Sequence, residues 1–261
     1  MNLKVRLSLM NFLQFAVWGA YLTSMGRYLG NIGIASEIGW FYSMQGVVSI
    51  FMPALMGIVA DRWIPAQRLL GYCHLLAGVF MFATAYYGAT AGDHVAFSTI
   101  FSLYTVSVAF YMPTLALTNS VAYSALSQAG MDTVKDFPPI RVFGTIGFIV
   151  TMWFVDLMGF QSNQYQFVTS GAISIILFLY TFSLPHCNIS DKTEQKSLVD
   201  ALGLRAFALF RQKRMAIFFI FSMLLGVSLQ ITNSFANPFL FSFKAIPEYA
   251  NSFGVQHANI L

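Results

Sequence analysis

Seven apolar segments, each close to the length that a helix needs to cross a bilayer, account for most of this sequence. A transmembrane helix requires about 20 consecutive, mainly apolar residues. The segments cover residues 7–29, 38–60, 69–89, 95–123, 139–160, 165–184 and 215–241. Membrane-spanning β-strands are shorter and alternate apolar with polar residues, which these segments do not do. The sequence therefore predicts an all-α integral membrane protein.

The composition excludes a soluble domain. Hydrophobic residues make up 57% of the chain, aromatic residues 16% and charged residues 9%, and the mean hydropathy is +0.66. Soluble domains are typically about 25% charged. An apolar surface of this extent is expected to face lipid, so the bilayer is the first predicted partner. The two cysteines, Cys73 and Cys187, indicate neither a disulfide framework nor a metal site.

Lysine and arginine are divided unevenly between the two sides of the membrane, which predicts the orientation of the chain. Only Arg27 and Lys244 lie on the side opposite to the N-terminus. The other twelve are Lys4, Arg6, Arg62, Arg68, Lys135, Arg141, Lys192, Lys196, Arg205, Arg211, Lys213 and Arg214. We therefore expect a cytoplasmic N-terminus. The same bias explains the pI near 9.1, so no nucleic-acid partner is predicted.

The order of spans and loops predicts the domain organisation. Residues 1–184 are expected to form a six-helix bundle, and residues 185–214 a cytoplasmic central loop. Residues 215–261 are expected to begin a second bundle with the seventh helix and the start of the eighth. This layout is typical of transporters built from two related halves. Because the last residues enter a new apolar run, we expect the sequence to be part of a longer transporter.

Polar and aromatic residues recur every three or four positions in four spans, which places them on one face of each helix. They are, span by span, Asn11, Gln14, Trp18 and Tyr21; Tyr104, Ser107, Tyr111, Thr114 and Thr118; Arg141, Thr145, Phe148 and Met152; and Gln230, Asn233 and Asn237. Any single one is better explained by a hydrogen bond within its helix or to a neighbouring helix. Four such faces together predict a shared polar cavity.

The chemistry of these faces favours a neutral polar ligand that contains a ring. Amides and hydroxyls both donate and accept hydrogen bonds, while Trp18, Tyr21, Tyr111 and Phe148 offer flat surfaces for stacking. A sugar, a nucleoside or an aromatic metabolite fits this mixture. A dianion fits it poorly, because Arg141 is the one cation in the spans with a strong claim to the site. Core packing is the alternative explanation for the aromatic residues.

Arg141 itself admits two interpretations. The sequence predicts a charged loop that ends at Pro138 and Pro139, with Arg141 in the first turn of the fifth span. An arginine there is either a cytoplasmic anchor or a donor to a ligand in the cavity. The face that it shares with Thr145 and Phe148 favours the second role.

Other features of the spans indicate structure or exclude classes of function. Gly144 and Gly147 would let another helix pack closely against the fifth span. His74 is better explained as a buried histidine than as a proton relay. The spans offer no lysine for a retinal Schiff base and no nucleophile–base pair or paired carboxylates, so no enzyme, catalytic residue, cofactor or metal is predicted. A cytoplasmic N-terminus argues against a signalling receptor.

Several stretches resemble a known transporter family. The segment GIVADRW, residues 57–63, resembles the signature after the second helix of the major facilitator superfamily, although Arg68 alone supplies the basic residues that follow it there. The stretches FMPALMGIVADRW, AGMDTVKDFPPIRVFGTIGF, ALFRQKRMAIFFIFSMLLG and LQITNSF are similar to the bacterial nucleoside:proton symporter family of that superfamily. The resemblance extends over the whole chain.

This resemblance implies a proton-coupled nucleoside uptake transporter with twelve helices in two halves and an alternating-access mechanism. The sequence would be truncated from those twelve helices, and the acids that couple protons in the family would lie in helices after this chain. The implied substrate-binding residues are Arg141, Thr145, Phe148, Gln230 and Asn233. Residues expected to line the cavity are Asn11, Gln14, Trp18, Tyr21, Tyr104, Tyr111 and Asn237.

The resemblance also implies the surroundings of the protein and leaves two alternatives open. Nucleoside and protons are the expected partners, the bacterial cytoplasmic (inner) membrane the expected location, and a monomer the expected state. The alternatives are a sugar:proton symporter of the same superfamily, and a membrane fragment that binds substrate or serves a structural role without transporting.

Overall fold

The computed structural model describes residues 2–187 and 204–260, and these ranges are helical without a β-strand. The α-helices are α1 (Leu3–Gly19), α2 (Met25–Asn31), α3 (Ile38–Arg62), α4 (Ala66–Thr90), α5 (Phe97–Gln128), α6 (Thr133–Leu157), α7 (Tyr165–Thr181), α9 (Lys213–Ser242) and α10 (Phe253–Gln256). Short 3-10 helices include η3 (Phe160–Ser162), η4 (Leu204–Arg211) and η5 (Phe243–Ala245). Within the described ranges, five helices are long and apolar enough to cross a membrane, and α7 is a shorter apolar helix.

The first predicted span, 7–29, is wrong as a single continuous helix. It is divided into α1 and α2 by turns over residues 20–24. In a bilayer, backbone groups released by such a break need new partners. The Tyr42 hydroxyl, from α3, supplies two of them: it donates to the carbonyl oxygen of Leu22 at 2.9 Å and accepts from the amide of Gly26 at 3.2 Å. The break is therefore built into the packing between α2 and α3.

The charged segment before the fifth span is also helical, against the prediction of a loop that ends at two prolines. α6 begins at Thr133, with Asp132 as its N-cap, and Pro138 and Pro139 lie inside it. Proline removes one helix hydrogen bond, a loss that is smallest near a helix start. Arg141 consequently lies about 12 Å inside the helix, given a rise of about 1.5 Å per residue.

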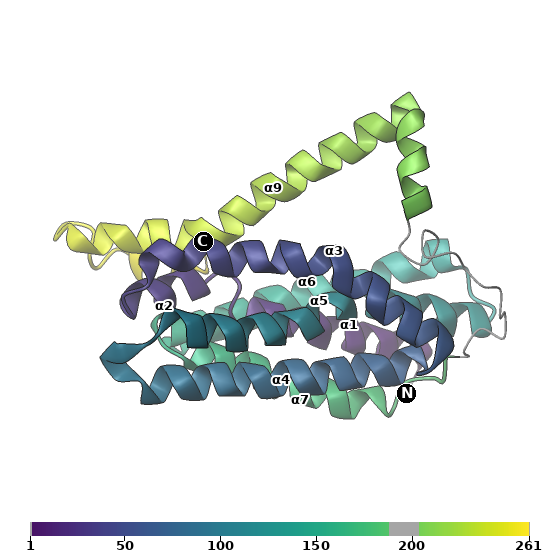
Figure 1. The fold of residues 1–261 in the computed structure, drawn as a ribbon, viewed down its shortest axis with the longest axis horizontal. Coiled ribbons are helices and arrows are strands. Elements are labelled where there is room, and N and C mark those ends of the chain that lie inside the picture. Colours follow the sequence, from purple (N-terminus) through teal and green to yellow (C-terminus); the bar gives the residue numbers. More distant parts are fainter. Residues whose placement is uncertain (1, 188–203, 261) are drawn as a thin grey trace.

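The helices before the central loop pack as one bundle. α1 packs against α6 and α7, α4 packs against α5 and α7, and α3 packs against α5. Figure 1 shows them side by side along the long axis of the molecule. Buried apolar residues form two clusters, one that contains Tyr21 and Tyr104 and another that contains Leu7 and Leu70.

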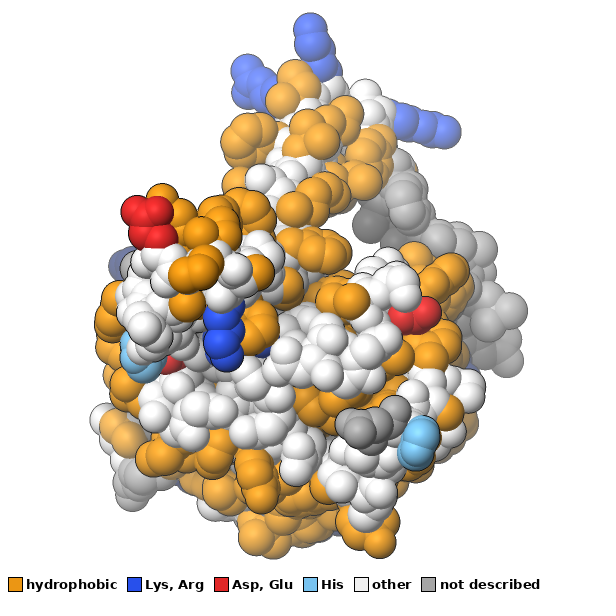
Figure 2. Space-filling model, turned by 90° about the vertical axis from the view of Figure 1, so that its left-hand side faces the viewer, with side chains coloured by type: hydrophobic (Ala, Val, Ile, Leu, Met, Phe, Trp, Pro, Cys, Tyr) orange, Lys and Arg blue, Asp and Glu red, His pale blue; other side chains and the backbone are white. Residues whose placement is uncertain are grey.

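The outer surface of the molecule is apolar. Large apolar side chains are exposed along α3, α4, α6 and α9. Trp40 and Trp63, at opposite ends of α3, are 63% and 67% exposed, as expected for residues at the two membrane–water interfaces. Figure 2, which views the end that carries α2, shows apolar side chains around much of the perimeter. This surface identifies a multi-pass membrane protein.

The helix after the central loop meets the bundle at one end only. The predicted loop, 185–214, falls largely on residues 188–203, which lie outside the described residues. Beyond η4, α9 extends away from the bundle over its first half and returns to it near α2 (Figure 1). Ser234 and Asn237 are the buried residues of α9, and the Phe235 ring lies 6.0 Å from the Tyr42 ring.

Candidate functional site

Three of the predicted substrate-binding residues lie on one stretch of α6. Arg141, Thr145 and Phe148 are spaced four and three residues apart on a continuous helix. Arg141 and Phe148 are half-buried, and Thr145 is exposed. This spacing places their side chains on one face. Arg141 lies about 12 Å from the start of the helix, after the charged residues Lys135 and Asp136.

Three glycines allow this part of α6 to pack tightly against α1. A Cβ atom on Gly147 would overlap the backbone of Phe12, and one on Gly19 of α1 would overlap the backbone of Phe148. A Cβ on Gly144 would lie 2.6 Å from the Phe15 ring. The predicted close approach of a neighbouring helix is thus confirmed, and the neighbour is α1.

The guanidinium group of Arg141 lies over an aromatic ring. Its Cζ atom is 3.9 Å from the centroid of the Phe15 ring, which comes from α1. Within the described part of the chain, none of its N–H groups forms a hydrogen bond and no carboxylate lies within ion-pair distance. A half-buried guanidinium normally finds such partners. Arg141 therefore retains donors that a ligand could use.

An aromatic group adjoins Arg141. The Trp18 ring of α1 lies 6.4 Å from the Phe148 ring, edge to face, and 6.2 Å from the Tyr111 ring of α5. The indole N–H of Trp18 donates to Gln45 Oε1 at 3.2 Å. Gln45, from α3, in turn donates from Nε2 to the Tyr104 hydroxyl at 2.7 Å. The position of Trp18 is therefore determined by four helices of the bundle.

A buried hydrogen-bond network lies behind this aromatic group and is centred on Gln14. The Gln14 Nε2 atom donates to Thr114 Oγ1 at 2.7 Å, and its Oε1 atom accepts from Thr118 Oγ1 at 2.9 Å. His74 Nε2 lies 2.8 Å from the same Oε1 atom, and His74 Nδ1 lies 2.9 Å from Ser174 Oγ. Both ring nitrogens of His74 are thus hydrogen-bonded, and the network joins α1, α4, α5 and α7.

Most residues expected to line the cavity are enclosed within the bundle. Asn11, Gln14, Tyr21, Tyr104 and Tyr111 are at most 1% exposed. Asn11 donates to the Leu7 carbonyl oxygen of its own helix at 3.0 Å, and the Tyr111 hydroxyl donates to the Gln14 carbonyl oxygen at 2.8 Å. These contacts stabilise the packing of the bundle. Trp18 is half-buried, so part of its ring remains accessible.

The predicted residues of α9 are separated from this face of α6. Gln230 and Asn233 are half-buried, and Gln230 Nε2 donates to Ser234 Oγ of its own helix at 3.3 Å. Among the described residues, no hydrogen bond joins either side chain to Arg141, Thr145 or Phe148. The structure therefore brings together the α1 and α6 residues and leaves the α9 pair apart from them.

Asp156 is a buried acid that the sequence analysis missed, although it lies inside the predicted fifth span. Its side chain is fully buried near the end of α6. Oδ1 lies 2.6 Å from His257 Nδ1, and Oδ2 accepts from the Asn259 amide at 3.0 Å. An ionisable residue inside a transmembrane segment is by itself a sign of function, and that signal was available in the sequence.

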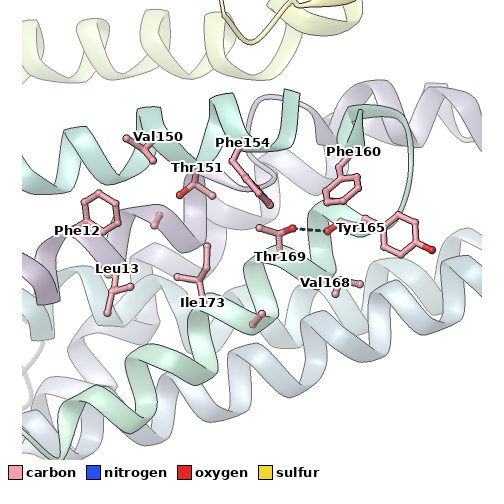
Figure 3. A pocket seen from close by; sticks show the side chains of 12 residues that line it. Phe12, Leu13, Val150, Thr151, Phe154, Phe160, Tyr165, Val168, Thr169 and Ile173 are labelled. Carbon is pink, nitrogen blue, oxygen red and sulfur yellow. Dashed lines mark hydrogen bonds between the residues drawn. The ribbon is translucent and has the colours of Figure 1, made fainter. Parts of the chain in front are cut away.

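A groove on the outer surface contains none of the predicted site residues. It has a volume of about 530 Å³. Figure 3 shows Phe12, Val150 and Ile173 among the side chains around it, with the hydrogen bond from Thr169 to the Tyr165 carbonyl oxygen at its edge. The groove lies between α1, α6 and α7 and is almost entirely apolar. Its character suits lipid chains better than a polar ligand.

The residues of this site are suited to bind a ligand by hydrogen bonding and stacking. Guanidinium donors, a hydroxyl and aromatic faces lie along α6 and its neighbours. In the two ranges that the structure describes, no group of three or more His, Cys, Asp or Glu side chains is placed to hold a metal ion.

Comparisons with known proteins agree with this description. A family model for nucleoside H+ symporters matches residues 1–261. The chain is 47% identical over 264 residues to the nucleoside permease NupG of Escherichia coli (strain K12) and 44% identical over 263 residues to the xanthosine permease of the same organism. Each alignment covers 100% of this chain, and the chain spans 61% of the length of each relative.

Solved structures give the same result for the fold. A crystal structure of the nucleoside transporter NupG matches with a TM-score of 0.82 at 46% identity, and a structure of a mutant of that transporter matches with a TM-score of 0.87 at 46% identity. These matches cover 100% and 99% of this chain and 63% of each solved chain. The predicted major-facilitator-type helical fold is confirmed.

Proposed function

This chain belongs to the nucleoside H+ symporter family, and from that premise we propose that the protein containing it is a proton-coupled nucleoside uptake transporter that works by alternating access. The observation that carries the proposal is the α6 face with Arg141, Thr145 and Phe148, beside Trp18, on a membrane bundle that resembles a nucleoside transporter. The two relatives named above are permeases, which are transporters and not enzymes.

The proposed substrate-binding residues would make two kinds of contact with the nucleoside. Arg141 and Thr145 would hydrogen-bond polar groups of the nucleoside, because the guanidinium has no hydrogen-bond partner within the described chain. Phe148 would stack on the base. Gln230 and Asn233, on α9, would complete the site from the other half of the protein when the two halves approach during the transport cycle.

The predicted cavity residues take supporting positions in this proposal. Trp18 would contact the ligand directly, since part of its ring is accessible. The buried residues Asn11, Gln14, Tyr21, Tyr104 and Tyr111 would form the wall of the cavity behind it. Asn237 would act at the contact between α9 and the bundle, where it is buried.

The arrangement in the membrane is part of the same proposal. We place the protein in the bacterial inner membrane as a monomer, with the N-terminus and the loop 185–214 in the cytoplasm. Residues 1–184 would form the N-terminal half and residues 215–261 would begin the C-terminal half. Lys4 at the start of α1 and Asp136 near the start of α6, ion-paired at 2.7 Å, then lie on the cytoplasmic side. On the outer side lie α2 and the last turn of α6, which carries Asp156.

The test is uptake by the full-length protein in right-side-out vesicles. One labelled purine nucleoside, one pyrimidine nucleoside and one labelled disaccharide are compared, with and without an inward proton gradient. We expect nucleoside accumulation that a protonophore abolishes and that Arg141→Ala reduces. Uptake of the disaccharide alone would support the sugar:proton symporter instead. Nucleoside binding without uptake would support the non-transporting alternative.

A further inference from the structure

Gln45 of α3 is a buried amide between the aromatic group of the candidate site and the interior of the bundle. Its Oε1 atom accepts from the indole N–H of Trp18 at 3.2 Å, and its Nε2 atom donates to the Tyr104 hydroxyl at 2.7 Å. The residue is 4% exposed, so it has almost no surface of its own to offer a ligand. Any effect of Gln45 on ligand binding therefore has to act through Trp18.

The orientation of the Gln45 amide follows from the chemistry of its two partners. An indole N–H can only donate a hydrogen bond, whereas a tyrosine hydroxyl can donate or accept one. The amide oxygen must therefore face Trp18, which leaves the amide nitrogen for Tyr104. The reversed amide would place two donors against each other at Trp18. Gln45 thus has one favourable orientation, and that orientation determines where the Trp18 N–H points.

Tyr104 gives this chain of hydrogen bonds a fixed end. Its ring lies 6.1 Å from the Tyr21 ring, edge to face, and 5.2 Å from the Phe41 ring. All three of these side chains are at most 1% exposed. Close-packed interiors leave little room for such rings to move. The bonds from Tyr104 through Gln45 to Trp18 therefore connect the rigid interior to a ring that is half-buried at the site.

The position of the Trp18 ring restricts how a flat ligand can lie on Phe148. The two rings are 6.4 Å apart, with an angle of 86° between their planes. A base that stacks parallel to Phe148 would be nearly perpendicular to Trp18 and would meet it with an edge. Because the indole N–H already donates to Gln45, Trp18 offers that edge an apolar ring surface. Trp18 would then restrict the base by shape, and Arg141 and Thr145 would supply the hydrogen bonds.

We propose that Gln45 is a positioning residue for nucleoside binding, which holds the Trp18 ring at right angles to Phe148 so that a flat base enters a preformed corner. The proposal rests on the proposed function, because that function assigns the base to Phe148. Ordering a large side chain when a ligand binds lowers the affinity by about two- to tenfold. Gln45 orders Trp18 before the ligand arrives and so removes this loss.

The first test compares three variants of the purified full-length protein by nucleoside affinity and thermal unfolding. Gln45→Met keeps the length of the side chain and removes both hydrogen bonds, so affinity should fall by about two- to tenfold. Gln45→Glu keeps an acceptor for Trp18 and a partner for Tyr104, and should retain the affinity of the parent. Gln67→Met is the matched control: Gln67 of α4 is also 4% exposed and accepts from the Cys187 amide at 3.0 Å. This control should lose stability but keep its affinity.

A double-mutant cycle separates positioning from packing. Trp18→Phe removes the indole N–H and keeps an aromatic ring, so Gln45 has nothing left to hold. In that background Gln45→Met should change nucleoside affinity by less than about twofold. An equal loss of affinity with and without Trp18 would overturn the proposal, because Gln45 would then act through packing alone. So would a folded Gln45→Glu protein that binds as weakly as Gln45→Met.

A measurement without ligand distinguishes failure of this proposal from failure of the proposed function. Every other tryptophan of the full-length protein is replaced by phenylalanine, and the fluorescence anisotropy of Trp18 is recorded. Gln45→Met should lower the anisotropy, because the ring gains freedom to rotate, while Gln45→Glu and Gln67→Met should preserve it. A parent that binds no nucleoside would refute the proposed function and leave this measurement valid. Unchanged anisotropy in Gln45→Met would overturn the positioning role. If Gln45→Met does not fold, Gln45→Asn takes its place, since its shorter side chain cannot reach both partners.

Discussion

The guanidinium carbon of Arg141 lies 3.9 Å from the centroid of the Phe15 ring, so the charge near the middle of this site is covered on one side by α1. Stacking of this kind contributes about 0.5–2 kcal/mol and leaves the guanidinium edge free for hydrogen bonds. The arrangement orients Arg141 without neutralising it, which is what a donor to a neutral polar ligand requires.

Replacing Arg141 by lysine tests whether that edge binds the ligand. Lysine keeps the charge but loses the planar donor fork. A hydrogen bond to a charged group contributes about 1.5–3 kcal/mol, so nucleoside affinity of the purified full-length protein should fall by about ten- to a hundredfold. Thr145→Val should cost less, since it removes one neutral hydroxyl. If neither Arg141→Lys nor Arg141→Ala changes affinity, Arg141 is only a membrane anchor.

The contact between α1 and α6 predicts the effect of a single methyl group. Gly147→Ala places a Cβ against the Phe12 backbone, and overpacking typically costs about 1–3 kcal/mol. The thermal unfolding temperature in detergent should fall, and nucleoside binding should weaken because Arg141 and Phe148 shift. Gly46→Ala on α3 is the control, since a Cβ there meets nothing within 4 Å. Equal unfolding temperatures for the two variants would contradict the close crossing.

The network around Gln14 predicts a difference between two amides on the same helix. Gln14→Leu leaves Thr114, Thr118 and His74 without a shared partner and should destabilise the bundle by about 1–2 kcal/mol. Asn11→Leu should cost much less, because among the described residues the Asn11 side chain hydrogen-bonds only to its own helix. Both are measured by thermal unfolding together with nucleoside binding. A loss of binding in Gln14→Leu with no loss of stability would instead favour a direct role in the cavity.

The orientation of the chain can be checked by labelling the loop and the opposite side separately. Lys196→Cys, in the loop 185–214, should react with an impermeant thiol reagent only after the cells are opened, because the charge bias places that loop in the cytoplasm. Ser36→Cys should react in intact cells. Labelling of Lys196→Cys from outside would reverse the orientation and, with it, the side of the membrane that the Asp156–His257 contact faces.

Several features of the fold were predictable because they depend on local sequence. The spans of α3, α4, α5 and α9 follow from runs of apolar residues, since hydropathy and length alone decide whether a segment suits a bilayer. The shared face of Arg141 and Phe148 follows from the helical period. The close approach at Gly144 and Gly147 follows from the absence of side chains, although the sequence could not identify the partner helix.

Other features depended on contacts between distant residues, and there the sequence analysis was wrong or incomplete. The break between α1 and α2 is stabilised by the Tyr42 hydroxyl from another helix, so the apolar run through residues 7–29 carried no sign of it. The helix that includes Pro138 and Pro139 contradicts the usual preference of proline for helix starts and loops. The cavity roles of the buried residues remain predictions.

The sequence by itself determined the membrane class, the apolar segments that become α3, α4, α5 and α9, and the faces that polar residues share on a helix, because each follows from composition or from a period of a few residues. Only the tertiary structure decided which faces meet. It enclosed Gln14 and Tyr111 inside one bundle, placed the Arg141 guanidinium over Phe15, and brought His257 to Asp156 across 101 positions of sequence. The physical reason is that packing and hydrogen bonding depend on distances in space, which local sequence patterns do not specify.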